Sequence, residues 1–524
     1  MNTLSRILTI SLLAVWWHSA SVASPTDPVV VTSPPSGQGD PQIPGARTLA
    51  DLSMGYVEEE FFISGTATLF NYGHNPPLGP TDIVPIAEGV PYTTRIIVRR
   101  PERANKFNGT VVIEWWNSTA GFDTAPVWDA SAEYFARNGI LYVGVTNSTD
   151  SINYLANGCM PFGLLPPTCG SRYATLSLPE NGLAFEMVSQ IANLLKSDAS
   201  ENPIPSSYPV ERIFHAGESQ QGGSVIAYAS SFHLQGINDG YFIQAFATAR
   251  PINFGPVCGE QDSLSYPDCT PRLVYPDNLV RTDLPVPVYH LVTQMDMELV
   301  FVLLCEGADE DEDYDCGDDH PLVVARQPDT PTFRYYEVAG GGHVTVHKDV
   351  ELIPAGPLGP DPIFLEDLCL NPINSTGDGP VFVSYVMNAL WERMYEQSVN
   401  GFVPPAGQLM DVDSSTGTIL RDAYGNGLGG VRLPSLEMPT ATYISGNQAD
   451  PDLPLFLQEF SNLACLLSGS VFPFDQATLD GLYRNDGQYT SGVAAAVKAL
   501  KSQGLLLQRD AITIKQAAAS GVPD

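Results

Sequence analysis

The chain has 524 residues, of which 44% are hydrophobic and 10% aromatic, so it is long and apolar enough to bury a large core. Its net charge of −34 repels phosphate backbones and therefore argues against nucleic-acid binding. The length allows one large domain with elaborations or two to three domains, whereas the acidity identifies no substrate.

Residues 1–23 have the pattern of a secretory signal peptide. Arg6 supplies the positive start, and the apolar run Ile7–Trp17 is too short to span a membrane. Small residues at 20–23 offer cleavage sites, and no other segment has about 18 uninterrupted apolar residues. The sequence therefore predicts a secreted or periplasmic protein without stable membrane insertion. Residues 24–50, rich in Pro, Gly, Ser and Thr, are predicted to be a flexible lead-in.

Predicted strands and helices alternate along the chain from about residue 56. Alternating apolar residues at 61–70 and 92–99 are typical of antiparallel strands. Further strands are predicted at 110–116, 140–145, 210–216, 286–292 and 333–338, and helices at 129–138, 182–196 and 224–229. This alternation predicts an α/β fold with a mostly parallel central sheet flanked by helices, spanning 51–524.

A C-terminal extension is predicted from about residue 378. It contains helical patterns at 381–396 and 492–503, separated by a Gly- and Pro-rich stretch at 420–443. Cysteine-bearing, loop-rich insertions interrupt the domain at 159–169 and 258–277.

The stretch from Val210 to Gly223, VERIFHAGESQQGG, runs from an apolar strand pattern through a turn at Ser219 into a helix-compatible run. This layout is that of a nucleophile elbow, which projects a serine hydroxyl toward a base and backbone N–H donors. Gly217 suits the crowded position two residues before the serine. Gln221 stands where a small residue is usual, although the two glycines after it can relieve the crowding.

A serine nucleophile needs a base and an orienting acid, which follow it in chain order on loops after later strands. Asp296 comes directly after the predicted strand 286–292, with Glu298 as the rival acid. His343 ends a glycine loop after the strand 333–338, with His347 as the rival base. The chain therefore predicts a catalytic triad of Ser219, Asp296 and His343, in that order.

Metal chemistry is the competing interpretation of the two histidines, which stand one helical turn apart. The zinc-protease motif requires a glutamate directly after the first histidine, and Val344 stands there instead. We expect no metal and no cofactor.

An oxyanion hole needs two N–H donors. The first is predicted at the backbone of Gln220, directly after the nucleophile. The second is expected from the loop after the strand 110–116, where Trp116, Asn117 and Ser118 are candidates and Asn117 is preferred. Asn117 also begins an Asn-Ser-Thr sequon, which we predict to be unused because a glycan there would block the site.

Eight cysteines fit an exported protein with disulfides. Sequential pairing, the simplest of the possible connectivities, joins Cys159 to Cys169, Cys258 to Cys269, Cys305 to Cys316, and Cys369 to Cys465. No pair has the two-residue spacing of common structural zinc sites.

A carboxylate-dense loop at 306–319 includes Asp309, Asp311 and Asp313. An EF-hand would require Gly where Tyr314 stands and Glu where His320 stands, so a solvated acidic loop is predicted and calcium is left open.

Four strings of this chain resemble the exported α/β-hydrolase-domain proteins, a group of expected esterases. They are TTRIIVRRPERANKFNGTVVIEWWN, HAGESQQGG, VAGGGH and DAYGNGLGGVRLPSLEMPTATY. The resemblance covers most of the chain from about Tyr56 and implies an α/β-hydrolase fold with Ser219 as nucleophile and His343 as base. It supplies no substrate, because one fold and triad serve many chemistries.

The expected function is hydrolysis of carboxylic esters, small or polymeric, through an acyl-enzyme. Two alternatives stay open: an acyltransferase with the same triad, and a binding protein that keeps the fold without catalysis. Oligomeric state is not readable from the sequence.

Overall fold

The computed structural model of the chain describes residues 29–39, 41–42, 49, 55–74, 79, 81–159, 169–245, 252, 279–301, 326–347, 351–353, 361–377, 379–414 and 416–522. The predicted signal peptide at 1–23 and the acidic loop at 306–319 lie outside these residues.

A nine-stranded sheet forms the centre of the molecule, in the order β1-β2-β3-β5-β4-β6-β7-β8-β9. Its strands are β1 (Val30–Thr32), β2 (Tyr56–Tyr72), β3 (Ile83–Pro101), β4 (Thr110–Trp115), β5 (Leu141–Val145), β6 (Arg212–Glu218), β7 (Gly240–Gln244), β8 (Val288–Thr293) and β9 (Phe333–Val338). The six strands from β4 to β9 are parallel to their neighbours within that group, while β1, β2 and β3 pair antiparallel. The predicted α/β class and mostly parallel sheet are confirmed.

The strand β1 departs from the predicted lead-in. Its residues pair antiparallel with Phe62 to Ser64 of β2, at the edge of the sheet. Three β-branched residues, Val30, Val31 and Thr32, suit an extended edge strand even within Pro- and Ser-rich sequence. Residues 30–32 therefore belong to the fold and do not form a flexible segment.

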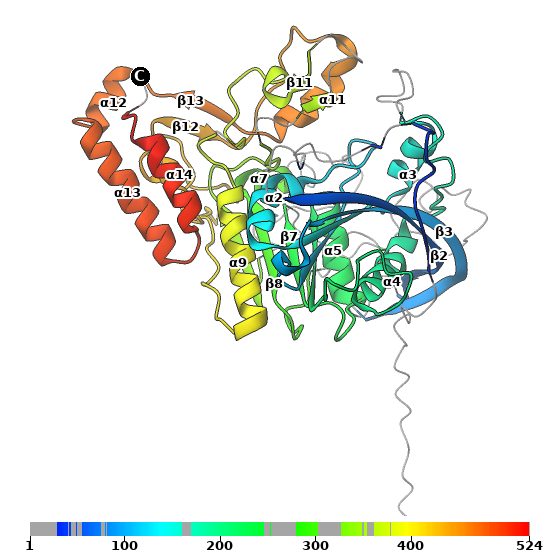
Figure 1. Cartoon of the computed structure of the whole chain (residues 1–524). Coiled ribbons are helices and arrows are strands. Elements are labelled where there is room, and N and C mark those ends of the chain that lie inside the picture. The colour runs from blue at the N-terminus through cyan, green and yellow to red at the C-terminus, as the bar shows by residue number, and fades with distance from the viewer. Residues whose placement is uncertain are drawn as a thin grey trace, which may run out of the picture.

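Helices cover both faces of the sheet (Figure 1). On one face α2 (Pro126–Asn138) and α9 (Ser384–Asn400) pack together, and on the other lie α4 (Ala184–Lys196) and α5 (Gln220–Ser231). Every residue of β4 and of β7 to β9 is buried, as parallel strands covered on both sides require. The shorter helices α3 (Thr149–Ala156) and α7 (Gln294–Phe301) follow β5 and β8 directly.

The C-terminal extension is attached to the central sheet through direct contacts. Its elements after α9 are α10 (Pro434–Glu437), β12 (Ala441–Ile444), α11 (Leu455–Leu466), β13 (Ser470–Pro473), α12 (Gln476–Leu482), α13 (Asp486–Ser502) and α14 (Gln508–Ala518). Before α9 lies the small β10–β11 pair, Glu351–Ile353 with Ile363–Phe364. Val431 continues the sheet by forming a parallel bridge with Val338 at the end of β9. Within the described residues, no helix has the length and apolar character needed to cross a membrane.

Two of the four predicted disulfides fall within the described residues. Cys159 is bonded to Cys169, and Cys369 to Cys465. The second bond lies in a small apolar cluster under α11, beside Val346, Leu365 and Leu368. Cys258, Cys269, Cys305 and Cys316 lie outside the described residues.

Removal of the Cys369–Cys465 bond is expected to destabilise the protein. The bond spans 96 residues, so replacing both cysteines by alanine should lower the free energy of unfolding by about 2–4 kcal/mol. The bond between Cys159 and Cys169 spans 10 residues. The matched double variant at these two cysteines should therefore lose about 1–2 kcal/mol less unfolding free energy than the Cys369/Cys465 variant. Urea unfolding without reductant measures both losses, and equal midpoints for wild type and the Cys369/Cys465 variant would contradict the expectation.

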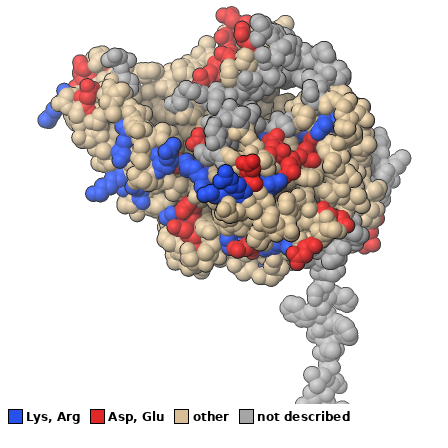
Figure 2. Space-filling view, in the orientation of Figure 1, with Lys and Arg blue, Asp and Glu red and all other residues tan. Residues whose placement is uncertain are grey.

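Charge is unevenly distributed over the surface despite the strong net acidity. On the face shown in Figure 2, basic side chains gather in a band across the middle, with acidic side chains beside and below it. The net charge of −34 is therefore not spread evenly over this face.

Candidate active site

Ser219 stands in a strained turn between β6 and α5. Its φ is 53° and its ψ −121°, a region that non-glycine residues rarely occupy, and its N–H donates to Gln244 O at 2.9 Å. This strained turn follows β6 directly at the carboxyl edge of the sheet, where a nucleophile elbow stands. Gly217 permits the turn, because a Cβ there would lie 2.4 Å from the carbonyl oxygen of Gln221.

The unusual Gln221 is accommodated inside the protein. Its side chain is buried and its Nε2 donates to Gln220 Oε1 at 3.3 Å, while its own Oε1 has no hydrogen-bond partner among the described residues. The crowding predicted at this turn is therefore relieved at Gly217, and Gln221 keeps a full side chain.

Asp296 and His343 are brought together at the same edge of the sheet, after β8 and β9. Asp296, in the first turn of α7, accepts hydrogen bonds at Oδ2 from the backbone N–H of Thr293 at 2.5 Å and from its hydroxyl at 2.8 Å. Its Oδ1 is in short contact with His343 Nδ1. With one carboxylate oxygen fixed by Thr293, the other is aimed at the imidazole.

The opposite side of the imidazole contacts a residue that the sequence analysis did not single out. Glu218, the last residue of β6, places Oε1 3.3 Å from His343 Nε2. Both side chains are 6% exposed. Among the described residues, the neighbour of Nε2 is the Glu218 carboxylate and not Ser219 Oγ. The sequence offered no signal for Glu218 beyond its position directly before the proposed nucleophile.

The two neighbouring carboxylates change the acidity of His343. Burial alone would lower the pKa of the imidazole, but the charges of Asp296 and Glu218 outweigh it and raise the pKa to about 9. Burial raises the pKa of Glu218 to about 7, reinforced by Asp296 and opposed by His343. The protonated imidazole is thus favoured, lying between two acidic groups.

The rival residues hold other structure in place. Glu298 Oε1 accepts from Arg421 Nη2 at 2.9 Å, and its Oε2 is in short contact with the Ser445 hydroxyl, so it anchors the C-terminal extension. The ring of His347 packs edge-on against Phe382, with ring centres 4.8 Å apart.

The loop after β4 lies beside the serine turn. Asn117 and Thr124 form an antiparallel bridge in which the Asn117 N–H donates to Thr124 O at 3.1 Å. The Asn117 side chain donates through Nδ2 to Glu218 Oε2 at 2.9 Å and to its carbonyl oxygen at 3.2 Å. The Trp116 N–H donates to Val145 O, so two of the three candidate oxyanion donors are already engaged.

Ser118 is the remaining candidate in that loop. Its N–H has one long contact, 3.4 Å, with the Gln220 side-chain Oε1, to which its hydroxyl also donates at 2.8 Å. The Gln220 N–H is at the start of α5, where helix geometry supplies no acceptor, and it donates to no other described residue. The geometry favours Ser118 over Asn117 as the second donor. A glycan at Asn117 would have to displace the bonds to Glu218.

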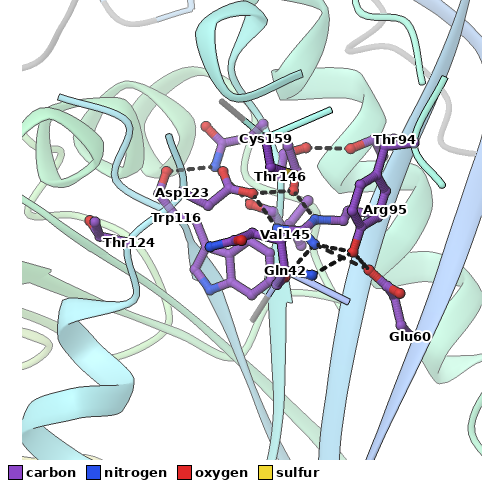
Figure 3. Close-up of polar contacts among 12 residues, drawn as sticks. Gln42, Glu60, Thr94, Arg95, Trp116, Asp123, Thr124, Val145, Thr146 and Cys159 are labelled. Atoms are coloured by element: carbon purple, nitrogen blue, oxygen red, sulfur yellow. Dashed lines mark hydrogen bonds and ion pairs between the residues drawn. The ribbon is translucent and has the colours of Figure 1, made fainter. Parts of the chain in front are cut away.

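A buried arginine supports the 117–124 loop (Figure 3). Arg95 of β3 is fully buried, and its guanidinium donates to Asp123 Oδ2 at 3.0 Å and Glu60 Oε1 at 3.1 Å. It also donates to Thr146 Oγ1 at 3.0 Å and lies over the Trp116 ring, 5.3 Å from its centre. The cation therefore ties the 117–124 loop to the sheet.

The glycine loop before His343 is held by the C-terminal extension. A Cβ on Gly342 would lie 2.7 Å from the backbone carbon of Ser468, so only glycine lets these two segments approach so closely. The Val344 N–H donates to Leu467 O at 2.9 Å, and Asn374 Nδ2 donates to Gly340 O at 2.8 Å. Residues far along the chain thus fix the position of the imidazole.

No group of three or more His, Cys, Asp or Glu side chains among the described residues has a geometry that could hold a metal ion.

The family described as "Alpha/beta hydrolase domain" matches residues 30–516 of this chain. No curated protein matches this chain. Solved structures with local similarity include a protein described as a dienelactone hydrolase from Klebsiella pneumoniae, with 12% identity, coverage of 44% of this chain and 72% of that one, and a TM-score of 0.22.

Two esterase structures match this chain with similarly low identity and TM-score. The rice cell wall degrading esterase LipA from Xanthomonas oryzae is 12% identical over 43% of this chain and 52% of its own, with a TM-score of 0.23. A glucuronoyl esterase from Solibacter usitatus is 10% identical over 52% of this chain and 69% of its own, with a TM-score of 0.26. The chain spans only about half the length of the Xanthomonas protein.

Proposed function

Because the chain belongs to the alpha/beta hydrolase domain family, we propose that it is a serine hydrolase that cleaves carboxylic esters through an acyl-enzyme. One observation carries the proposal. Ser219 occupies a strained turn at the same edge of the sheet as the Asp296–His343 pair. A strained serine at the same sheet edge as an oriented imidazole suits nucleophilic catalysis.

In the proposed mechanism, Ser219 Oγ attacks the ester carbonyl carbon while His343 Nε2 takes the hydroxyl proton. Asp296 keeps the imidazole oriented through Nδ1 and stabilises its cation. The tetrahedral intermediate collapses, His343 returns the proton to the leaving alkoxide, and the alcohol departs. Water, deprotonated by the same imidazole, then attacks the acyl-enzyme and releases the acid with Ser219 restored.

The negative oxygen of the intermediate needs donors aimed at it. We assign this role to the backbone N–H groups of Gln220 and Ser118, and no longer to Asn117. Gln220 contributes the free N–H at the start of α5, and Ser118 can turn its N–H from the long contact with Gln220 toward a substrate.

We further propose that the enzyme works outside the cytoplasm, either secreted or in the periplasm. The disulfides Cys159–Cys169 and Cys369–Cys465 support an oxidising compartment, as does the signal-like sequence of residues 1–23.

Covalent labelling provides the direct test of this function. A fluorophosphonate probe is expected to modify Ser219 in the folded protein, and peptide mass spectrometry locates the adduct. A panel of nitrophenyl esters of increasing acyl length then reports the preferred acid, and added alcohols separate hydrolysis from acyl transfer by their products. A protein that resists the probe and leaves every ester intact would favour the non-catalytic alternative.

A further inference from the structure

We propose that Glu218 is a positioning residue of the same site: its carboxylate, held by Asn117, is a second counter-charge to the His343 imidazolium, opposite Asp296. This inference rests on the proposed function for its catalytic meaning. Its structural content, the coupling between Glu218 and His343, can be measured independently of activity.

Glu218 lies on the Nε2 side of the His343 imidazole. Asp296 contacts Nδ1, whereas Glu218 Oε1 lies 3.3 Å from Nε2, the nitrogen that exchanges protons with the nucleophile. Glu218 also precedes Ser219 directly, so the rigid end of β6 fixes both groups near Nε2. A carboxylate with this placement acts on the imidazole whenever Nε2 carries a proton.

Asn117 determines where that carboxylate points. Its Nδ2 donates to Glu218 Oε2 at 2.9 Å and to the Glu218 carbonyl oxygen at 3.2 Å, which leaves Oε1 to face His343. All three side chains are buried, so water screens the interaction little. One amide from the loop after β4 thus orients a charge at the base.

The charged groups against the imidazole, among the described residues, are Asp296 from α7 and Glu218 from β6. The 467–468 segment, which packs on the His343 loop, is Leu-Ser and carries no charge. Removal of the Glu218 charge leaves Asp296 as the one counter-ion that the described part of the chain supplies.

Glu218 has two opposed effects on catalysis. It stabilises the imidazolium that forms as Ser219 attacks, which lowers the barrier. It also keeps Nε2 protonated in the resting enzyme up to higher pH, consistent with the raised pKa of His343, and a protonated imidazole cannot act as a base. The wild-type enzyme should therefore lose activity as pH falls through the raised pKa of His343.

The substitution Glu218→Gln tests this role because it removes the charge and keeps the shape and the Asn117 contact. The acid limb of the kcat/KM profile is expected to move to lower pH by about one to three units. The plateau at high pH should fall, while KM for a short-chain nitrophenyl ester stays near the wild-type value. A Glu218→Asp variant, which keeps the charge but withdraws it by one methylene, should shift the limb in the same direction by less.

Proton NMR supplies a readout that needs no turnover. The Nδ1–H resonance of His343, shifted downfield by its bond to Asp296, reports the protonation of the imidazole across a pH titration. In Glu218→Gln the titration midpoint should fall by about the same one to three units. Should Glu218→Gln fail to fold, the Asp variant carries both measurements.

Glu392→Gln is the matched control, because Glu392 on α9 accepts a hydrogen bond from the Tyr134 hydroxyl at 2.8 Å and does not contact His343. Its acid limb and NMR midpoint should equal those of wild type. A wild-type midpoint in Glu218→Gln, or in the Asp variant where Gln does not fold, overturns the inference even if Ser219 takes the fluorophosphonate. A shifted midpoint with an unlabelled Ser219 supports the coupling and refutes the proposed function instead.

Discussion

Replacement of Ser219 by alanine is expected to reduce kcat for ester hydrolysis by about 10⁴- to 10⁶-fold. The variant keeps the oxyanion donors and the Asp296–His343 pair but has no atom that can form an acyl-enzyme. Substrate binding should change little, so KM measured on any residual activity stays near the wild-type value. Initial rates on a short-chain nitrophenyl ester, with fluorophosphonate labelling in parallel, measure the loss.

The control for this variant lies one helical turn further along α5. Ser224 is buried, and its hydroxyl has only a long contact, 3.5 Å, with the Gln220 carbonyl oxygen. Ser224→Ala should therefore retain activity and labelling. Alanine keeps the Cβ and therefore the backbone strain at position 219, so a melting temperature equal to that of wild type would show that the lost activity is chemical. Full hydrolysis by Ser219→Ala would rule out the acyl-enzyme mechanism.

Replacement of Arg95 by leucine should cost about 3–5 kcal/mol of folding free energy. The substitution removes the cation from between Glu60 and Asp123, whose side chains are 7% and 2% exposed. Those carboxylates would remain buried with fewer partners, which costs far more than a missing surface ion pair. Urea unfolding followed by tryptophan fluorescence measures the loss, and activity should also fall because Asp123 supports the 117–124 loop.

An exposed ion pair provides the comparison. Arg281 and Asp283 are 30% and 71% exposed and lie 2.8 Å apart. Arg281→Leu should change stability by no more than about 1 kcal/mol. Arg95→Lys should fall between the two leucine variants, because lysine restores the charge without the five-donor fork. Similar losses of folding free energy in Arg95→Leu and Arg281→Leu would show that burial does not make the Arg95 ion pairs more stabilising than an exposed pair.

The candidate triad could be located from the sequence because each member directly follows a strand. Ser219, Asp296 and His343 lie at the carboxyl ends of β6, β8 and β9, and parallel strands bring such positions to one edge. The paired strands β2 and β3 were equally readable, since alternation of apolar residues marks one buried face. Local periodicity was sufficient wherever an element packs by its own pattern.

Glu218 was missed because its role depends on tertiary contacts. A glutamate at the end of an apolar strand resembles a solvated strand terminus, and only the positions of Asn117 and His343 reveal a buried charge. β7 was missed for a different reason: its sequence, GYFIQ, opens on Gly, which strands disfavour, and runs on into Ala-Phe-Ala without a turn signal. The contacts of Val431, Leu467 and Ser468 were also unreadable, because these residues lie between regular elements and act through tertiary contacts and not through periodicity.

The packing of the C-terminal extension on the His343 loop also fixes when the protein can first act. During synthesis the nucleophile and the base emerge well before Val431 and Leu467. Until those residues arrive, β9 lacks its bridge to Val431, and Val344 lacks its bond to Leu467. The nascent chain thus carries all three proposed catalytic residues before the His343 loop has its C-terminal contacts. On the proposed function, activity would therefore begin only once the C-terminal extension has folded against the His343 loop.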